Sequence, residues 1–169
     1  MTTLYLVRHG ETVDNANQIL QGQTQGQLNE NGVKQARELA AKLSDKHIDA
    51  FVSSDLRRSI QTCEILAEPH CMDIVTTPLL RERDWGGFTG MFIPDIKDKP
   101  WPSDVETIDE MKGRAQQFLQ WIANNYDGKT VLAVGHGIIN KAIQSVYTGK
   151  PMNEIKKMMN VDLRELKVV

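Results

Sequence analysis

Short apolar runs alternate along the chain with longer segments in which apolar residues recur every three or four positions. The runs are bounded by polar residues or glycine, which is typical of buried strands, and they lie at 3–8, 50–53 and 130–135. The periodic segments predict amphipathic helices at 32–44, 55–67, 105–125 and 138–148. We expect Asp55 to be the N-cap of the second helix.

Strands that alternate with helices predict an α/β fold, here a three-layer αβα sandwich with a mostly parallel central sheet. In such a fold, functional sites lie beyond the carboxyl ends of the strands. The tail 162–169 could add an edge strand. No repeat or linker divides the chain, so we expect one domain over 1–169, with a short proline-containing flap at about 91–104.

Composition and net charge indicate which kinds of binding partner to expect. The 169 residues are 40% hydrophobic and 25% charged, with a net charge of −2 and a pI near 6.1. This charge balance predicts no nucleic-acid or membrane partner. No apolar run could span a bilayer and no signal sequence is evident, so we expect a cytoplasmic protein. An oligomer is possible, but the composition does not indicate one.

The two cysteines suggest neither a metal site nor a disulfide. Cys63 and Cys71 lack metal-ligand spacing, so we expect both to be small buried apolar residues. We accordingly expect no metal and no cofactor.

Charged residues recur where strands end. The first strand runs directly into Arg8 and His9, and the strand at 130–135 runs into His136 and Gly137. The strand at 50–53 leads into a helix that begins with two arginines, and segment 79–90 places Glu82 between two more. Each feature taken singly is also compatible with a core histidine, a surface arginine or a solvated carboxylate.

Taken together, these strand ends predict an anion site. Two histidines and two arginines around one small volume would repel one another unless an anion lay between them. Arginine forks match phosphate oxygens, and the N-termini of the helices after 54 and 136 would add backbone N–H groups. A neutral imidazole could then attack phosphorus without a metal, and Glu82 could protonate the leaving oxygen.

The motifs LVRHGETVDN, SSDLRRSIQT, LLRERDWGGFTG and VLAVGHGIIN resemble those of the histidine phosphatase superfamily, in its phosphoglycerate mutase-like branch. The resemblance runs from residue 4 to about 148. It implies that His9 is the phosphorylated nucleophile, Glu82 the proton donor and His136 a second catalytic histidine. It also implies phosphate-binding roles, which we assign to Arg8, Asn15, Arg58 and Gly137.

The departures from the family pattern concern the substrate. The loop after Asn15 has Gln18, Gln25 and Gln27 where relatives carry an arginine, an acidic residue and a proline. The flap is also short, whereas mutases resembling this chain enclose their site more fully. A mutase must keep its phosphohistidine away from water, so the short flap favours a phosphatase.

We therefore predict a metal-independent phosphomonoesterase that hydrolyses small phosphorylated metabolites through a phosphohistidine. The flap aromatics Trp85, Phe88, Phe92 and Trp101 could line an apolar wall or simply pack together. A phosphoglycerate mutase, a phosphatase of phosphohistidine proteins and a catalytically silent phosphate-ester or protein-binding module are the alternatives.

Overall fold

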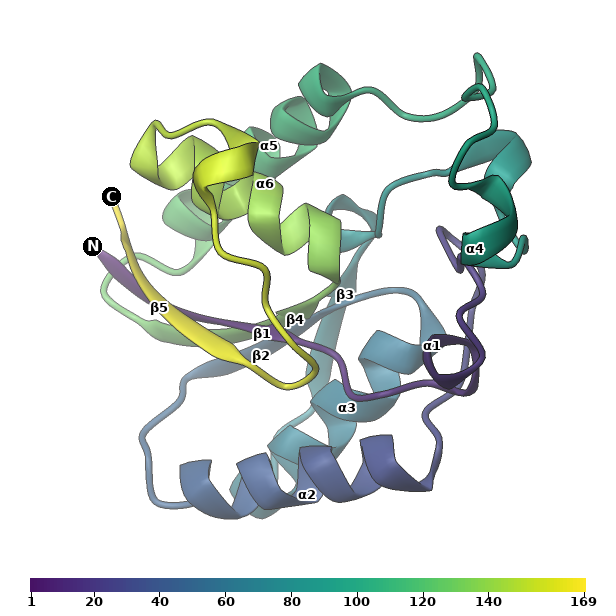
Figure 1. Cartoon of the computed structure of the whole chain (residues 1–169). Helices are drawn as coiled ribbons and strands as arrows, with labels where there is room; N and C mark the ends of the chain where they lie inside the picture. Colours follow the sequence, from purple (N-terminus) through teal and green to yellow (C-terminus); the bar gives the residue numbers. More distant parts are fainter.

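Five strands form one sheet at the centre of the protein, in the order β3-β2-β4-β1-β5 (Figure 1). This computed structural model describes all residues from 1 to 169. Strands β1 to β4 run parallel, and β5 runs antiparallel to β1 at one edge. The strands are β1 (Thr2–Arg8), β2 (Ala50–Ser54), β3 (Ile74–Thr77), β4 (Thr130–Gly135) and β5 (Leu163–Val168).

Helices cover both faces of this sheet. Figure 1 shows α5 and α6 on one face, α2 and α3 on the other, and the one-turn helices α1 and α4 beyond one end of the strands. This arrangement confirms the predicted three-layer α/β fold. The helices are α1 (Val13–Ala16), α2 (Glu30–Leu43), α3 (Arg57–Ala67), α4 (Ile93–Ile96), α5 (Ile108–Asn125) and α6 (Gly137–Thr148).

The sheet separates two apolar clusters because neighbouring residues of a strand point to opposite faces. In β4, Val131 and Ala133 pack in the cluster under α5 and α6, whereas Leu132 and Val134 pack in the cluster under α2 and α3. The central strands are therefore apolar throughout, as parallel strands covered on both faces require. None of the helices is long and apolar enough to cross a membrane.

Two local expectations are wrong, and one strand was not foreseen. Asp55 does not cap α3, whose N-cap position is Leu56; instead Asp55 accepts two 2.7 Å hydrogen bonds from Arg81. Cys71 is exposed, in a left-handed turn with φ of 54°, although Cys63 is buried as expected. Strand β3 was not predicted, because two of its four residues face solvent and leave no apolar run to detect.

The flap contains more structure than its sequence indicates. Helix α4 forms within it, and Phe92 makes an antiparallel bridge to Ile19. Backbone hydrogen bonds from Gly90 to Leu20 (2.7 Å) and from Ile93 to Gln18 (2.8 Å) join the flap to the loop after α1. This pairing lies outside the sheet, so no strand periodicity marks it. The flap and this loop thus form one layer beyond the strand ends.

Candidate active site

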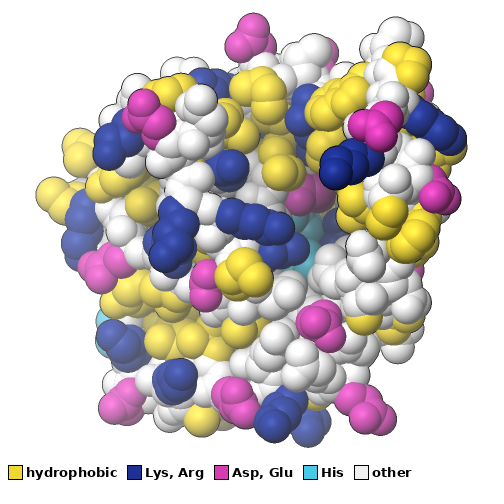
Figure 2. All heavy atoms as spheres, viewed as in Figure 1, with side chains coloured by type: hydrophobic (Ala, Val, Ile, Leu, Met, Phe, Trp, Pro, Cys, Tyr) yellow, Lys and Arg dark blue, Asp and Glu magenta, His cyan; other side chains and the backbone are white.

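The two histidines come together because their strands are neighbours. Strands β1 and β4 pair in parallel with Arg8 opposite Gly135, so the next residue of each chain segment leaves the sheet at the same edge. The rings of His9 and His136 meet edge to face, with centroids 5.0 Å apart. The predicted convergence of these two strand ends is therefore present. Figure 2 shows histidine atoms at the bottom of a surface hollow bordered by Lys and Arg side chains.

His9 is held as a neutral imidazole with one free nitrogen. Its side chain is buried, and Nδ1 donates a 2.7 Å hydrogen bond to the carbonyl of Gly10, which fixes the proton on Nδ1. Burial, followed by the nearby charges of Arg58 and Arg8, holds the pKa of His9 well below its usual 6.5. The Nε2 lone pair is consequently available to attack an electrophile at neutral pH.

His136 is oriented by a serine from the neighbouring strand. Ser54 Oγ lies 2.8 Å from Nε2 and also accepts the backbone N–H of Leu56. The other ring nitrogen, Nδ1, is buried and has no partner in the protein. Burial, followed by the charge of Arg58, lowers the pKa of His136 well below 6.5. A buried ring nitrogen without a partner marks a position where a ligand atom can bind.

Arg58 is the buried member of the arginine pair that opens α3. It is 1% exposed, whereas Arg57 faces solvent. Its guanidinium donates to the carbonyl of Gly22 (2.7 Å) and to that of Thr24, while Nε is buried without a partner. Burial lowers the pKa of Arg58 to about 10, partly offset by the Glu82 carboxylate, so it stays charged at neutral pH.

Arg8 is fixed by the segment before β5, residues 155–162, which we call the strap. Arg8 Nη1 donates to the carbonyl of Met158 (2.9 Å), and Asn160 Nδ2 donates to the carbonyl of His9 (3.0 Å). Val161 has φ of 55°, an unfavourable value for a β-branched residue, and its N–H donates to the Arg8 carbonyl at 2.9 Å. Arg8 Nε is buried and has no partner.

The Glu82 carboxylate lies at the N-terminus of α6. Its oxygens accept the backbone N–H groups of Ile138 (3.0 Å) and Ile139 (3.0 Å). A Cβ atom on Gly137 would lie 3.6 Å from Arg8 Cζ and 3.7 Å from Glu82 Oε2, so Gly137 lies close to both groups. These N–H groups were expected to face the ligand directly; in the structure they hold the acid instead.

Arg114 of α5 fixes the segment that bears Glu82. Its guanidinium donates to the carbonyls of Leu79 (3.1 Å) and Arg81 (2.8 Å), and more weakly to that of Glu82 (3.4 Å). It also forms a two-pronged ion pair with Glu106, and both side chains are largely buried. The acid is thus held through its own backbone as well as through its carboxylate.

Asn15 is not brought into this cluster by any contact. Its Oδ1 accepts the N–H of Thr12 (3.2 Å) in the capping box of α1. The N-terminus of α3 is likewise occupied, because Gln25 accepts the N–H groups of Arg57 and Arg58. Phosphate-binding roles for Asn15 and Gly137 therefore stay predictions.

A family model described as the histidine phosphatase superfamily (branch 1) matches residues 4–169. The chain belongs to this superfamily. The identification confirms the resemblance seen in the four sequence motifs and the predicted phosphatase class.

Individual members of the superfamily cover almost the whole chain. An "uncharacterized phosphatase PhoE" of Bacillus subtilis is 34% identical over 98% of this chain and 88% of its own length. A "metal-independent phosphoserine phosphatase" of Arabidopsis thaliana is 33% identical over 90% of this chain and 74% of its own. A "probable phosphoglycerate mutase GpmB" of Enterobacter is 33% identical over 89% of this chain and 77% of its own length.

Solved structures of this superfamily share the fold. A mycobacterial glucosyl-3-phosphoglycerate phosphatase, solved with VO3, superposes with a TM-score of 0.89 at 25% identity. The match covers 98% of this chain and 92% of that one.

Several residues of the site were not singled out from the sequence. Ser54 was seen only as the end of a strand, and its contact with His136 depends on the pairing of β2 with β4. Met158 and Asn160 gave no signal, because the strap has no periodicity and Met158 acts through its backbone carbonyl. In this histidine phosphatase the strap is as much part of the site as the strand ends are.

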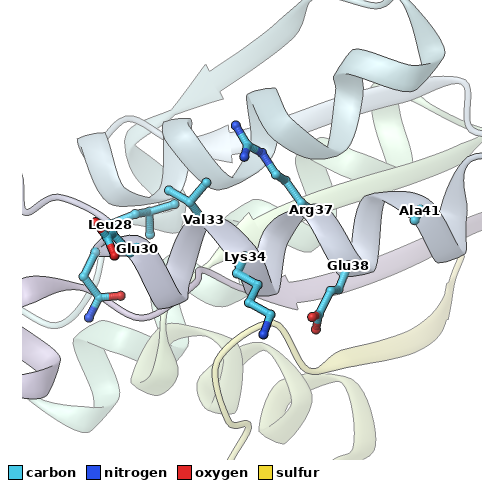
Figure 3. Close-up of a pocket in the computed structure, with 8 residues that line it drawn as sticks. Leu28, Glu30, Val33, Lys34, Arg37, Glu38 and Ala41 are labelled. Carbon is cyan, nitrogen blue, oxygen red and sulfur yellow. The ribbon is translucent and has the colours of Figure 1, made fainter.

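A separate hollow on the surface does not belong to the site. A groove of about 590 Å³ follows the outer side of α2, and Figure 3 shows Lys34 and Glu38 projecting from that helix. Its lining includes none of the histidines, and its polar residues are solvated helix side chains. The chemical groups, and not the size of a hollow, therefore locate the active site.

Proposed function

We propose that this protein is a metal-independent phosphomonoesterase that acts through a phosphohistidine at His9. The observation that supports this best is the set of buried donors around His9 that lack a partner within the protein. Arg8 Nε, Arg58 Nε and His136 Nδ1 are all of this kind. A phosphoryl group is small, tetrahedral and anionic, so it can accept from several of these donors at once.

In the first step, Nε2 of neutral His9 attacks phosphorus and the bond from phosphorus to the ester oxygen breaks. Arg8 and Arg58 neutralise the charge on the non-bridging oxygens, the role that a metal plays in other phosphoryl-transfer enzymes. If Ser54 donates its O–H to Nε2 of His136, the proton on Nδ1 makes that atom a further donor to the phosphoryl group. Glu82, as the acid, gives its proton to the departing alcohol.

In the second step, the Glu82 carboxylate takes a proton from water, whose oxygen attacks phosphorus. The P–N bond then breaks, inorganic phosphate leaves and His9 returns to its neutral form. The closeness of both Glu82 Oε2 and the Arg8 guanidinium to Gly137 supports a position of the acid near the phosphoryl group. One carboxyl group can thus serve as acid and then as base, because the water attacks phosphorus from the side that the alcohol has left, opposite His9.

We propose small phosphorylated metabolites as substrates and the cytoplasm as the location. Names of relatives support this substrate class, since they include phosphatases of phosphoserine and of glucosyl-3-phosphoglycerate. Mutase activity is the second candidate, favoured by the similarity to the GpmB protein. The exposed flap argues for hydrolysis, because Phe92 and Ile93 are 40% and 44% exposed and nothing in the chain covers them.

The test is phosphate release from p-nitrophenyl phosphate and a panel of metabolite monoesters, with EDTA present. Wild type should release phosphate, and His9→Ala should lose roughly 10⁴-fold or more in kcat/KM. The matched control is His47→Ala, which removes an exposed histidine outside the site. Faster transfer to a glycerate than to water, in the presence of a bisphosphorylated primer, would favour the mutase instead.

A further inference from the structure

The flap carries an unusual share of the exposed apolar surface. Met91, Phe92, Ile93 and Trp101 are four of the large hydrophobic residues that are more than a third exposed, and all four fall within 11 positions of the chain. Figure 2 shows apolar side chains along the side of the molecule where the flap lies, next to the hollow that contains the histidine atoms. Contiguous exposed apolar surface on a small protein commonly marks a binding site.

Two of these side chains, Ile93 and Trp101, line a cavity of about 500 Å³ between the flap and the loop after α1. Six apolar or aromatic side chains line most of it, and Lys97 is its one charged residue; the six include Leu20, Trp85, Phe88, Ile93 and Trp101. Trp101 packs edge to face on Trp85, with centroids 5.4 Å apart. The aromatics thus pack on one another and still leave a cavity in the size range of small-molecule sites.

The aromatic wall of the cavity lies beside groups that hold two residues of the reaction centre, Arg58 and Glu82. A Cβ atom on Gly22 would lie 3.5 Å from Trp85 Cδ1, and the carbonyl of the same Gly22 accepts a hydrogen bond from Arg58. Arg83, whose N–H donates to the Glu82 carboxylate, stacks over the rings of Trp85 (4.8 Å) and Trp101 (5.1 Å). Trp85 therefore lies beside the backbone that anchors Arg58, and Arg83 connects the Trp85 and Trp101 rings to the Glu82 carboxylate.

The position of the acid sets the direction of the leaving group. Glu82 must lie within hydrogen-bond reach of the ester oxygen that it protonates, so the rest of the alcohol extends past Glu82. The residues that follow Glu82 in the chain lead directly into the Trp85 wall. An alcohol that extends along these residues would approach the apolar cavity.

We propose that this cavity binds the leaving group, and that the preferred substrates are phosphate monoesters of aromatic or bulky apolar alcohols. The proposal rests on the phosphatase function proposed above. Burial of an apolar ring in the cavity supplies binding energy that a small polar alcohol such as serine cannot supply. The neutral loop with Gln18, Gln25 and Gln27 agrees with this class, since it offers no charge to a polar alcohol.

The first experiment compares kcat/KM for phenyl phosphate and 1-naphthyl phosphate, whose leaving groups have similar acidity but differ by one ring. We expect wild type to prefer the naphthyl ester roughly tenfold, from the additional apolar area buried. Ile93→Ser and Trp101→Ala should each reduce this preference. Val75→Ser is the matched control, because Val75 is 44% exposed like Ile93 but lies on β3, outside the cavity. It should leave the preference unchanged.

A binding measurement separates the two proposals. The His9→Ala protein cannot form the phosphohistidine, so calorimetry can record its affinity for 1-naphthyl phosphate without turnover. We expect tighter binding of the naphthyl ester than of phenyl phosphate, and loss of that difference in the double variant with Ile93→Ser.

The outcomes are distinct. Phosphate release with equal kcat/KM for both esters, or a preference that Ile93→Ser and Trp101→Ala leave intact, would overturn the leaving-group subsite and retain the phosphatase. No release from any ester would overturn the phosphatase function itself, and release that persists in His9→Ala would overturn the phosphohistidine at His9.

Discussion

The two buried histidines make the stability of the fold depend on pH, in a direction that the structure predicts. His9 and His136 are 3% and 0% exposed, and burial is the main reason that both pKa values are well below 6.5. In the unfolded chain each imidazole takes up a proton below about pH 6.5, whereas in the folded protein it stays neutral. Because the unfolded state then binds more protons, the free energy of unfolding falls as pH falls through 6.5.

The magnitude follows from the linkage relation. Each histidine lowers the free energy of unfolding by about 1.4 kcal/mol for each pH unit below its pKa in the unfolded chain. The pair therefore lowers it by about 2.8 kcal/mol at about pH 5.5. Carboxyl groups with lowered pKa values, such as Asp55 and Glu106, begin to lose their stabilising contribution only nearer their ordinary values of 3.8 and 4.5. The interval between about pH 7.5 and 5.5 therefore isolates the histidines.

Urea unfolding followed by circular dichroism at these two pH values measures the effect. His9→Asn and His136→Asn should each remove about half of the pH dependence, and the double variant should remove nearly all of it. Vanadate or phosphate should also reduce the loss of unfolding free energy at the lower pH, because a bound anion stabilises the protonated rings. An unfolding free energy that is the same at both pH values in wild type would refute the assignment of two neutral buried histidines.

Three further predictions test the packing around the site. Gly135→Ala places a Cβ 2.2 Å from Oδ1 of buried Asn140, so it should cost about 1–3 kcal/mol in urea unfolding, with partial recovery in the double variant with Asn140→Ala. Arg114→Met leaves its buried carboxylate partner unpaired and should cost about 3–5 kcal/mol, with a lower kcat, by thermal unfolding and phosphate release. In the native protein a thiol reagent should modify exposed Cys71 and spare Cys63, because burial raises the pKa of the Cys63 thiol; rapid labelling of both would contradict this.

The strand ends were predictable because their signal is local. An apolar run leads into Arg8 and His9, and a second one leads into His136, so each combines buried-strand composition with reactive groups. The parallel pairing of β1 with β4 then brings the two histidines together. Arg58 could be separated from Arg57 only through the family resemblance, since both arginines open the same helix. The sequence likewise placed Glu82 near the site without indicating that α6 would hold it.

The parts that escaped prediction depend on backbone groups and on distant pairing. Met158 holds Arg8 through a carbonyl that any residue could supply, so its side chain gives no signal. Asp55 met the N-cap rule but pairs with Arg81, because a charged partner from the next loop lies within 2.7 Å. The flap pairs with the loop at Ile19 and Leu20 outside any sheet. Hydrophobic periodicity along the sequence cannot reveal such a pairing.

The most direct test of the central claim is to trap the covalent intermediate. Glu82→Gln protein can still bind a phosphate ester but cannot activate water, so it should accumulate phosphorylated enzyme when mixed with p-nitrophenyl phosphate and quenched rapidly. Mass spectrometry of the digested protein should find one acid-labile phosphoryl group, on the peptide that contains His9. Phosphate release without any covalent phosphoryl group, or a phosphoryl group on a residue other than His9, would contradict the mechanism.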